Sequence, residues 1–187
     1  MAPTIHLVRH AQGYHNLNVE NESIRDPDLT PLGESQCANV RDVFIHHDKL
    51  TRLIASPLRR TLHTCIQSFG EDHLYPVLPL DLLQEVSDAP CDTGSDPAKL
   101  AEEFGSKVEV RGLNAEWMNK GPDSKFEPTL EKLAARGREA RRVIRSLLND
   151  LDGDEHIAVV SHGGFLHFLT DDWYGIPPTR GTFSFLR

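Results

Sequence analysis

Two histidines in this sequence directly follow apolar segments that are typical of buried strands. His10 comes after LVR (residues 7–9), and His162 comes after AVVS (158–161). Either histidine alone is more often a structural or surface group. A neutral imidazole, with an ordinary pKa of about 6.5, is nevertheless a competent nucleophile at neutral pH. The pair therefore indicates nucleophilic or acid–base chemistry at the carboxyl ends of two strands.

Arginines accompany both the first histidine and the start of a helix. Arg9 precedes His10, and the segment SPLRR (56–60) carries Arg59 and Arg60 directly after a strand-like run. Guanidinium groups match phosphate oxygens in a bidentate way, and a helix N-terminus adds unpaired N–H groups and a favourable dipole. Arginines, histidines and a helix start together predict a pocket for phosphate.

The elements that must position these residues alternate between strand and helix patterns. Thr30 and Pro31 supply an N-cap and a first helical residue. In the first half of the chain we expect strands at 4–9, 52–56 and 75–78 and helices at 31–46 and from Pro57 onward.

The second half begins with a weakly patterned segment, residues 84–125, in which only a short helix at 98–104 is plausible. We interpret this segment as a lid-like insertion, because long irregular loops in compact domains usually bind ligands or are disordered. A long helix is predicted at 127–151, a buried strand at 156–160, a helix after Gly164 and an edge strand at 182–186. The order predicts one domain (1–187) with a three-layer α/β/α sandwich, mainly parallel, and a site above the strand ends.

The composition excludes several classes of partner. The chain has 187 residues and a formal net charge of −8, which disfavours nucleic acid and anionic membranes. Its apolar runs are shorter than the ~20 residues of a membrane-spanning helix, and no secretion signal is visible. Three cysteines at irregular spacing predict free thiols. We expect a cytoplasmic protein with a small phosphorylated substrate, and a solvated helix face for the arginines 136, 138, 141, 142 and 145.

Four motifs in order resemble the histidine phosphatase superfamily, also called phosphoglycerate mutase-like. They are LVRHAQGYHN (7–16), DPDLTPLGESQ (26–36), SPLRRTLHT (56–64) and VVSHGG (159–164). The first resembles small members from plants and fungi more than bacterial ones. The resemblance implies a metal-independent phosphatase that needs no cofactor and passes through a phosphohistidine.

Carried onto this chain, the resemblance implies a role for each of five residues. His10 accepts the phosphoryl group, while Arg9, Arg60 and Asn16 bind its oxygens. His162, in its protonated form, completes the charge cluster.

The general acid is expected in LQEV (83–86), where the resemblance implies Glu85, and Asp88 and Asp92 compete with it in sequence. Arg60 aligns with the arginine of the family motif, so Arg59 is expected to be an exposed side chain.

The sequence also allows other interpretations of the function. A phosphoglycerate-type mutase shares these motifs but is usually longer, and a non-catalytic phosphate-binding module would keep the fold alone. Asp26 and Asp28 match the DxDxT pattern of magnesium-dependent phosphatases, although the preceding residues are polar rather than a buried strand. A cysteine nucleophile lacks its arginine six residues later. Zinc is disfavoured by Arg9 beside His10 and by the spacing of the histidines.

Overall fold

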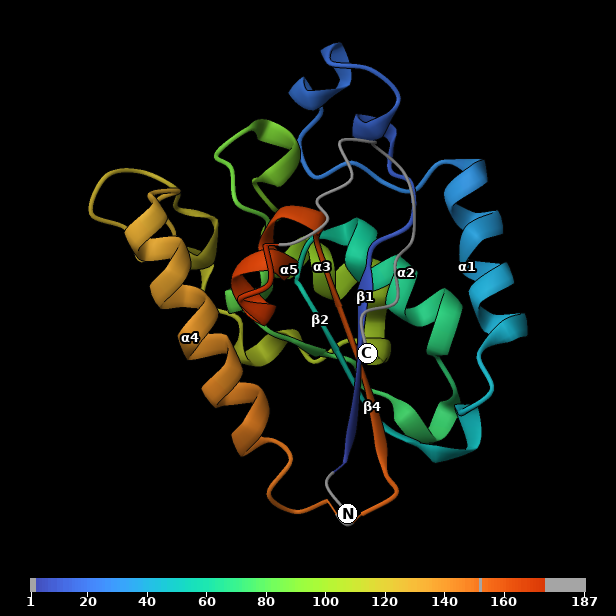
Figure 1. Ribbon diagram of the computed structural model, residues 1–187. Helices are drawn as coiled ribbons and strands as arrows, with labels where there is room; N and C mark the ends of the chain where they lie inside the picture. The colour runs from blue at the N-terminus through green and yellow to red at the C-terminus, as the bar shows by residue number, and fades with distance from the viewer. Residues whose placement is uncertain (1–2, 152, 174–187) are drawn as a thin grey trace.

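The computed structural model describes residues 3–151 and 153–173, which contain a four-stranded sheet in the order β1-β4-β2-β3. Every neighbouring pair of strands is parallel. The strands are β1 (Thr4–Arg9), β2 (Leu50–Ala55), β3 (Leu78–Pro79) and β4 (His156–Ser161). The helices are α1 (Pro31–Val43), α2 (Arg59–Phe69), α3 (Pro97–Phe104), α4 (Leu130–Ser146) and α5 (Gly163–Thr170). Helices lie on both sides of the sheet (Figure 1), which confirms the three-layer α/β/α class.

The side-chain alternation of β4 divides the core into two layers. Ala158 and Val160 join the apolar cluster that contains residues of α1, α2 and α3. Ile157 and Val159 join the cluster formed with α4 and α5. Successive side chains of a strand point to opposite faces, so a strand buried on both faces is apolar throughout.

Several element ends differ from those expected. Helix α1 starts at Pro31 as predicted, because Thr30 Oγ1 accepts the Gly33 N–H at 3.0 Å, but it ends at Val43. Helix α2 begins at Arg59 rather than Pro57, since Leu58 is still extended. The third strand is Leu78–Pro79, later than predicted. The edge strand expected at 182–186 lies outside the described residues.

The irregular segment 84–125 contributes to the hydrophobic core. It contains α3 and several short 3-10 turns. Leu100, Phe104, Val108 and Trp117 are buried in the same cluster as α2, and Trp117 is fully enclosed. This packing fixes one side of the segment against the sheet layer.

Two arginines of α4 are not on a solvated face, so that expectation is wrong for them. Arg136 is 3% exposed and donates to the carbonyl oxygens of Gln84 (2.8 Å) and Glu85 (3.0 Å). Arg141 donates to two carbonyls at the end of α5. The long arginine stem can reach unpaired carbonyls across a helix interface, and Arg138, Arg142 and Arg145 remain exposed.

No helix among the described residues is both long and apolar enough to cross a membrane. The three cysteines are free, as the sequence predicted, and all three are buried.

A cluster of three histidines near the start of β4 predicts acid-sensitive stability. His6 Nε2 and His156 Nδ1 are 2.9 Å apart, and the rings of His46 and His156 have centroids 4.6 Å apart. Burial and the two neighbouring histidines lower the pKa of His6 from 6.5 to about 4. The unfolded chain therefore binds more protons than the folded one between these values, so the free energy of unfolding falls as the pH drops through that window.

We expect His6→Gln, which can still donate to His156, to show a shallower loss of stability from pH 7 to pH 4.5 than the wild type. Urea unfolding at a series of pH values measures both slopes. The depressed histidines that do not contact His6 contribute equally to both proteins, so identical slopes would contradict the assignment.

Candidate active site

His10 lies directly after β1, buried and held in one orientation. It is 5% exposed, and its Nδ1 is 2.7 Å from the carbonyl oxygen of Ala11. A ring nitrogen that faces a carbonyl must carry the proton, which leaves a lone pair on Nε2. Burial first, then the charges of Arg60, His15 and Arg9, hold the pKa of His10 well below 6.5. His10 is therefore neutral, with Nε2 available as a nucleophile.

His162 follows β4 and lies beside His10, with ring centroids 5.2 Å apart. Parallel pairing of β1 with β4 brings them together, since Arg9 is in register with Ser161. His162 Nδ1 is 3.1 Å from the Arg60 guanidinium, and Nε2 is 2.8 Å from Ser56 Oγ. A guanidinium only donates, so Nδ1 accepts and the ring is neutral.

The pKa of His162 is correspondingly held well below 6.5 by burial, then by Arg60 and His10. In the absence of phosphate the Arg60 contact thus favours a neutral His162, and the protonated His162 expected from the resemblance stays a prediction for the phosphate-bound site.

Arg60, in the first turn of α2, is fully buried and fixed by three groups. Its guanidinium donates to the Cys91 carbonyl (2.6 Å), to Asp92 Oδ1 (2.8 Å) and to His162. The other oxygen of Asp92 accepts the Ser87 hydroxyl at 2.6 Å. Both Asp92 oxygens are thus occupied, so this carboxylate orients Arg60.

Arg9 is a second cation of this site, in addition to Arg60. Its Nε is buried and has no hydrogen-bond partner within the described part of the chain. Burial lowers the pKa of Arg9, the Glu85 charge raises it and the Arg60 charge lowers it. Arg9 therefore lies close to both groups with donor capacity left for a ligand.

Glu85 is fixed at the start of α5. Its Oε1 accepts the backbone N–H groups of Val86 and Phe165, each at 2.9 Å, and its Oε2 accepts that of Gly164 at 3.2 Å. A Cβ on residue 164 would lie 2.6 Å from Oε1, so only glycine allows this approach. Burial and then the Asp92 charge raise the pKa of Glu85. The third candidate acid, Asp88, is exposed.

Asn16 closes the loop that follows β1. Its Oδ1 accepts the Gly13 N–H at 3.0 Å within the short turn Tyr14–Asn16. The amide NH₂ is therefore the end of this side chain that can donate to a ligand.

Several residues at the site were not anticipated from the sequence. His15 has a ring centroid 5.4 Å from that of His10, and its buried Nδ1 has no hydrogen-bond partner among the residues that the structure describes. Burial with Arg60 and Arg9 lowers its pKa to about 3. Its place beside Asn16 in LVRHAQGYHN was the one available signal. Ser56 lies in the SPLRRTLHT motif but was not singled out, whereas Arg136 and Lys120 lie outside the quoted motifs.

Asp26 and Asp28, which match the pattern of magnesium-dependent phosphatases, do not lie where that class of enzyme needs its nucleophile. Glu20–Ser23 is a short 3-10 turn, so Asp26 does not end a strand. Arg59, expected to be exposed, is part-buried and pairs with Asp28 Oδ2 (2.8 Å) and Glu103 Oε2 (2.6 Å). Asp28, His63 and Glu103 could by spacing hold a metal ion, but the guanidinium already binds both carboxylates.

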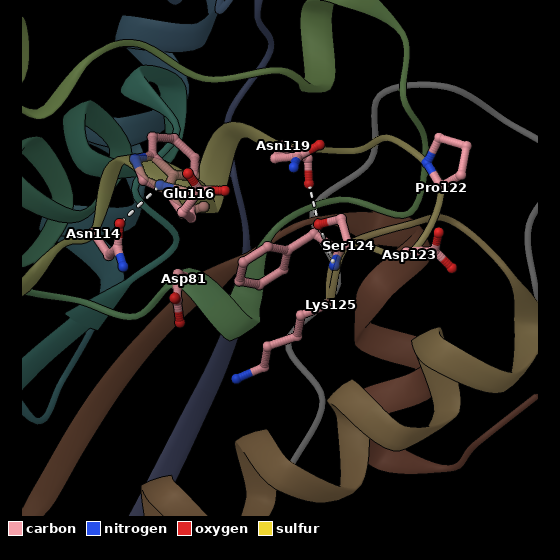
Figure 2. Close-up of a pocket in the computed structure, with 10 residues that line it drawn as sticks. Asp81, Asn114, Glu116, Asn119, Pro122, Asp123, Ser124 and Lys125 are labelled. Atoms are coloured by element: carbon pink, nitrogen blue, oxygen red, sulfur yellow. Dashed lines mark hydrogen bonds between the residues drawn. The ribbon is translucent and has the colours of Figure 1, made fainter.

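A separate open pocket of about 530 Å³ lies between the 114–126 segment and Asp81. Figure 2 shows Asp81 and Lys125 next to each other, with Asn119 above them. None of its lining residues is among the predicted site residues.

Residues 5–184 match the histidine phosphatase superfamily (branch 1), and the chain belongs to this family. A phosphoglycerate mutase-like protein of Arabidopsis thaliana is 30% identical over 208 residues, which cover 89% of this chain and 73% of that protein. The plant relative agrees with the resemblance drawn from the first motif.

Solved structures share the fold. The ecdysone phosphate phosphatase of Bombix mori, in complex with tungstate, has a TM-score of 0.64 at 15% identity and covers 94% of this chain and 81% of its own. A phosphoserine phosphatase of Entamoeba histolytica in complex with 3-phosphoglyceric acid has a TM-score of 0.54 at 20% identity, covering 88% and 76%. At these identities the likeness concerns the architecture.

Proposed function

We propose that this protein is a metal-independent phosphatase that hydrolyses the phosphate monoester of a small organic molecule through a phosphohistidine on His10. The observation that carries the proposal is the neutral, buried His10, whose Nδ1 is tied to the Ala11 carbonyl while Arg9 and Arg60 lie beside it. Membership of the histidine phosphatase superfamily supports it.

In the first step, Nε2 of His10 attacks phosphorus, and the bond from phosphorus to the leaving oxygen breaks. Glu85 donates its proton to that oxygen, so the product leaves as an alcohol. In the second step, Glu85 as carboxylate takes a proton from water, the resulting hydroxide displaces phosphate from Nε2, and free His10 returns. Burial favours the protonated form of Glu85 that the first step needs.

Positive charge around the phosphate supplies most of the catalysis in this scheme, because phosphoryl transfer depends chiefly on positioning and electrostatic stabilisation. Arg9, Arg60 and the Asn16 amide bind the oxygens. His162 accepts from Arg60 in the free site, and a phosphate dianion beside it would favour its protonated form, which could then donate to an oxygen.

The ligand class follows from charge and from structural neighbours. The net charge of −8 argues against nucleic acid and anionic membranes as partners. The Entamoeba histolytica neighbour binds 3-phosphoglyceric acid, which supports a small phosphorylated molecule. We further propose that residues 1–187 form one domain in the cytoplasm, with segment 84–125 covering the site as a lid.

We expect the purified protein to hydrolyse p-nitrophenyl phosphate equally fast with EDTA and with added magnesium, since the site concentrates cations rather than metal ligands. Release of inorganic phosphate measures the rate. Loss of activity in EDTA with recovery in magnesium would instead favour the Asp26 and Asp28 reading. Transfer of phosphate to phosphoglycerate without release to water would favour the mutase, and no turnover would favour a binding module.

We expect Glu85→Gln to slow phosphorylation of the enzyme by an alkyl phosphate by about 100-fold or more, the scale of a positioned general acid. An aryl phosphate with a nitrophenolate leaving group should be slowed much less, because that group departs without protonation. Single-turnover kinetics must be used, since slow dephosphorylation would affect both substrates alike. Equal effects on the two phosphorylation rates would exclude Glu85 as the acid.

A further inference from the structure

The second motif of the sequence, DPDLTPLGESQ (26–36), supplies no group to the proposed reaction, yet it packs against the loop that carries the nucleophile. Its second half forms the start of α1, with Thr30 as the N-cap. Thr30, Gly33 and Gln36 follow one another at a spacing of three residues, so each is a neighbour of the next on the helix surface. All three approach the backbone of Gln12, which lies in the loop after β1.

The backbone of Gln12 is held at both of its polar groups by this helix start. Its N–H donates to Gln36 Oε1 at 2.9 Å, and its carbonyl oxygen accepts the Thr30 N–H at 2.9 Å. A Cβ on residue 33 would lie 2.2 Å from that carbonyl oxygen, so only glycine permits the approach. Thr30 and Gly33 therefore bring Gln12 to the helix, and Gln36 supplies the acceptor for its N–H.

The peptide group that Gln36 binds is the one that orients the nucleophile. The Gln12 N–H and the Ala11 carbonyl belong to a single planar trans unit, so they point in opposite directions. With the N–H on Gln36, the carbonyl oxygen lies 2.7 Å from His10 Nδ1. Hydrogen bonds in a chain also polarise one another, so a bound N–H makes the carbonyl a stronger acceptor. Gln36 thus acts on His10 through one peptide group.

The other peptide group of Ala11 is fixed from a different helix. The Ala11 N–H donates to Thr64 Oγ1 at 3.0 Å, and the Thr64 hydroxyl donates to the Arg60 carbonyl oxygen at 2.7 Å. This bond holds Ala11 against α2 but leaves rotation about its Cα–C bond free. The place of Ala11 therefore depends on Thr64, whereas the direction of its carbonyl depends on Gln36.

We propose that Gln36 is a positioning residue for His10, which holds the Ala11 carbonyl against Nδ1 and so keeps the proton on Nδ1 and the lone pair on Nε2. The inference rests on the proposed function, because it takes Nε2 as the atom that attacks phosphorus. Without an acceptor at position 36, the Gln12 N–H is left unpaired, which favours rotation of the peptide group. The imidazole then places its proton on either nitrogen, and the tautomer with the proton on Nε2 has no lone pair there for attack.

Three variants test this role. Gln36→Met removes the acceptor at nearly constant length, whereas Gln36→Glu keeps an oxygen acceptor and loses only the amide NH₂. A backbone N–H needs only an acceptor, so Gln36→Glu is the conservative variant. Ser35→Ala is the matched control, because the exposed Ser35 hydroxyl donates to the Pro31 carbonyl within the same helix. Thermal unfolding checks that each variant is folded.

The direct readout is the tautomer of His10, from the ¹⁵N chemical shifts of its ring nitrogens in protein labelled with ¹⁵N-histidine. The signals that disappear in His10→Ala assign them. In the phosphate-free wild type at pH 7, Nδ1 should have the shift of a protonated nitrogen and Nε2 that of an unprotonated one. Gln36→Met should draw the two shifts toward each other as the tautomers mix, whereas Gln36→Glu and Ser35→Ala should keep them apart.

The kinetic consequence concerns the phosphorylation step. In single-turnover experiments with p-nitrophenyl phosphate, Gln36→Met should lower the maximal phosphorylation rate by about tenfold or more, within the range that a small misplacement of a reacting group costs. The concentration that gives half of this rate should change little, because Arg9 and Arg60 still bind the phosphate. Gln36→Glu should recover most of the lost rate, which a general loss of packing at α1 would not allow.

Ring shifts that are unchanged in Gln36→Met, or a Gln36→Glu variant as impaired as Gln36→Met, would overturn the inference and leave the phosphohistidine proposal intact. Mixed tautomers together with a wild-type phosphorylation rate would overturn it as well. If the wild type forms no phosphohistidine and hydrolyses no phosphate monoester, the proposed function fails. The ring shifts then still decide whether Gln36 orients His10.

Discussion

His10→Ala is expected to lower kcat/KM for phosphate monoesters by about 10⁴-fold or more, the largest effect of any single change in this protein. Without the nucleophile the phosphohistidine cannot form, so the two-step path that the arginines stabilise is lost. The imidazole of His10 is already neutral and already oriented by the Ala11 carbonyl, and alanine supplies no nucleophile in its place.

The decisive measurement is capture of the phosphoenzyme. Wild-type protein quenched at alkaline pH after brief exposure to a ³²P-labelled substrate should carry label that is stable to base and labile to acid. His10→Ala should carry none. His15→Gln is the matched control, because its ring lies 5.4 Å from His10 and shares its burial, and it should still be labelled.

Label that persists in His10→Ala and disappears in His15→Gln would move the nucleophile to His15. Label found on an aspartate or a cysteine would refute the phosphohistidine mechanism.

Arg60→Met is expected to lower kcat/KM by about 10³-fold and also to destabilise the fold. The loss of activity follows from removal of a preorganised cation at the phosphate. The loss of stability follows because Asp92, 6% exposed, would keep a buried charge without its partner. Breaking a buried ion pair by removing one member costs about 3–5 kcal/mol.

The double variant Arg60→Met with Asp92→Asn separates the two effects. With both charges gone, the free energy of unfolding from urea titration should recover much of the loss. Activity should stay at the level of Arg60→Met, because the phosphate still lacks its cation. If activity recovers together with stability, Arg60 serves the fold alone and our assignment to phosphate binding is wrong.

Short-range sequence signals were enough to predict the strands and helices that position the site. Thr30 and Pro31 predicted the start of α1, and the continuous apolar run 157–160 predicted a strand buried on both faces. These signals depend on capping and side-chain period, which act over a few residues. Because parallel strands end at the same edge of a sheet, His10 and His162 could be expected to meet there.

The charge states and partners of the site were decided by tertiary structure. Arg60 and His162 are 102 residues apart in the chain, and their contact favours a neutral His162 in the absence of phosphate. Arg60 donates a hydrogen bond to Asp92, and the carboxylate of Glu85 accepts a backbone N–H at the N-terminus of α5. The apolar and capping signals of a sequence are local, whereas a pKa depends on burial and on charges that only folding brings within a few ångströms.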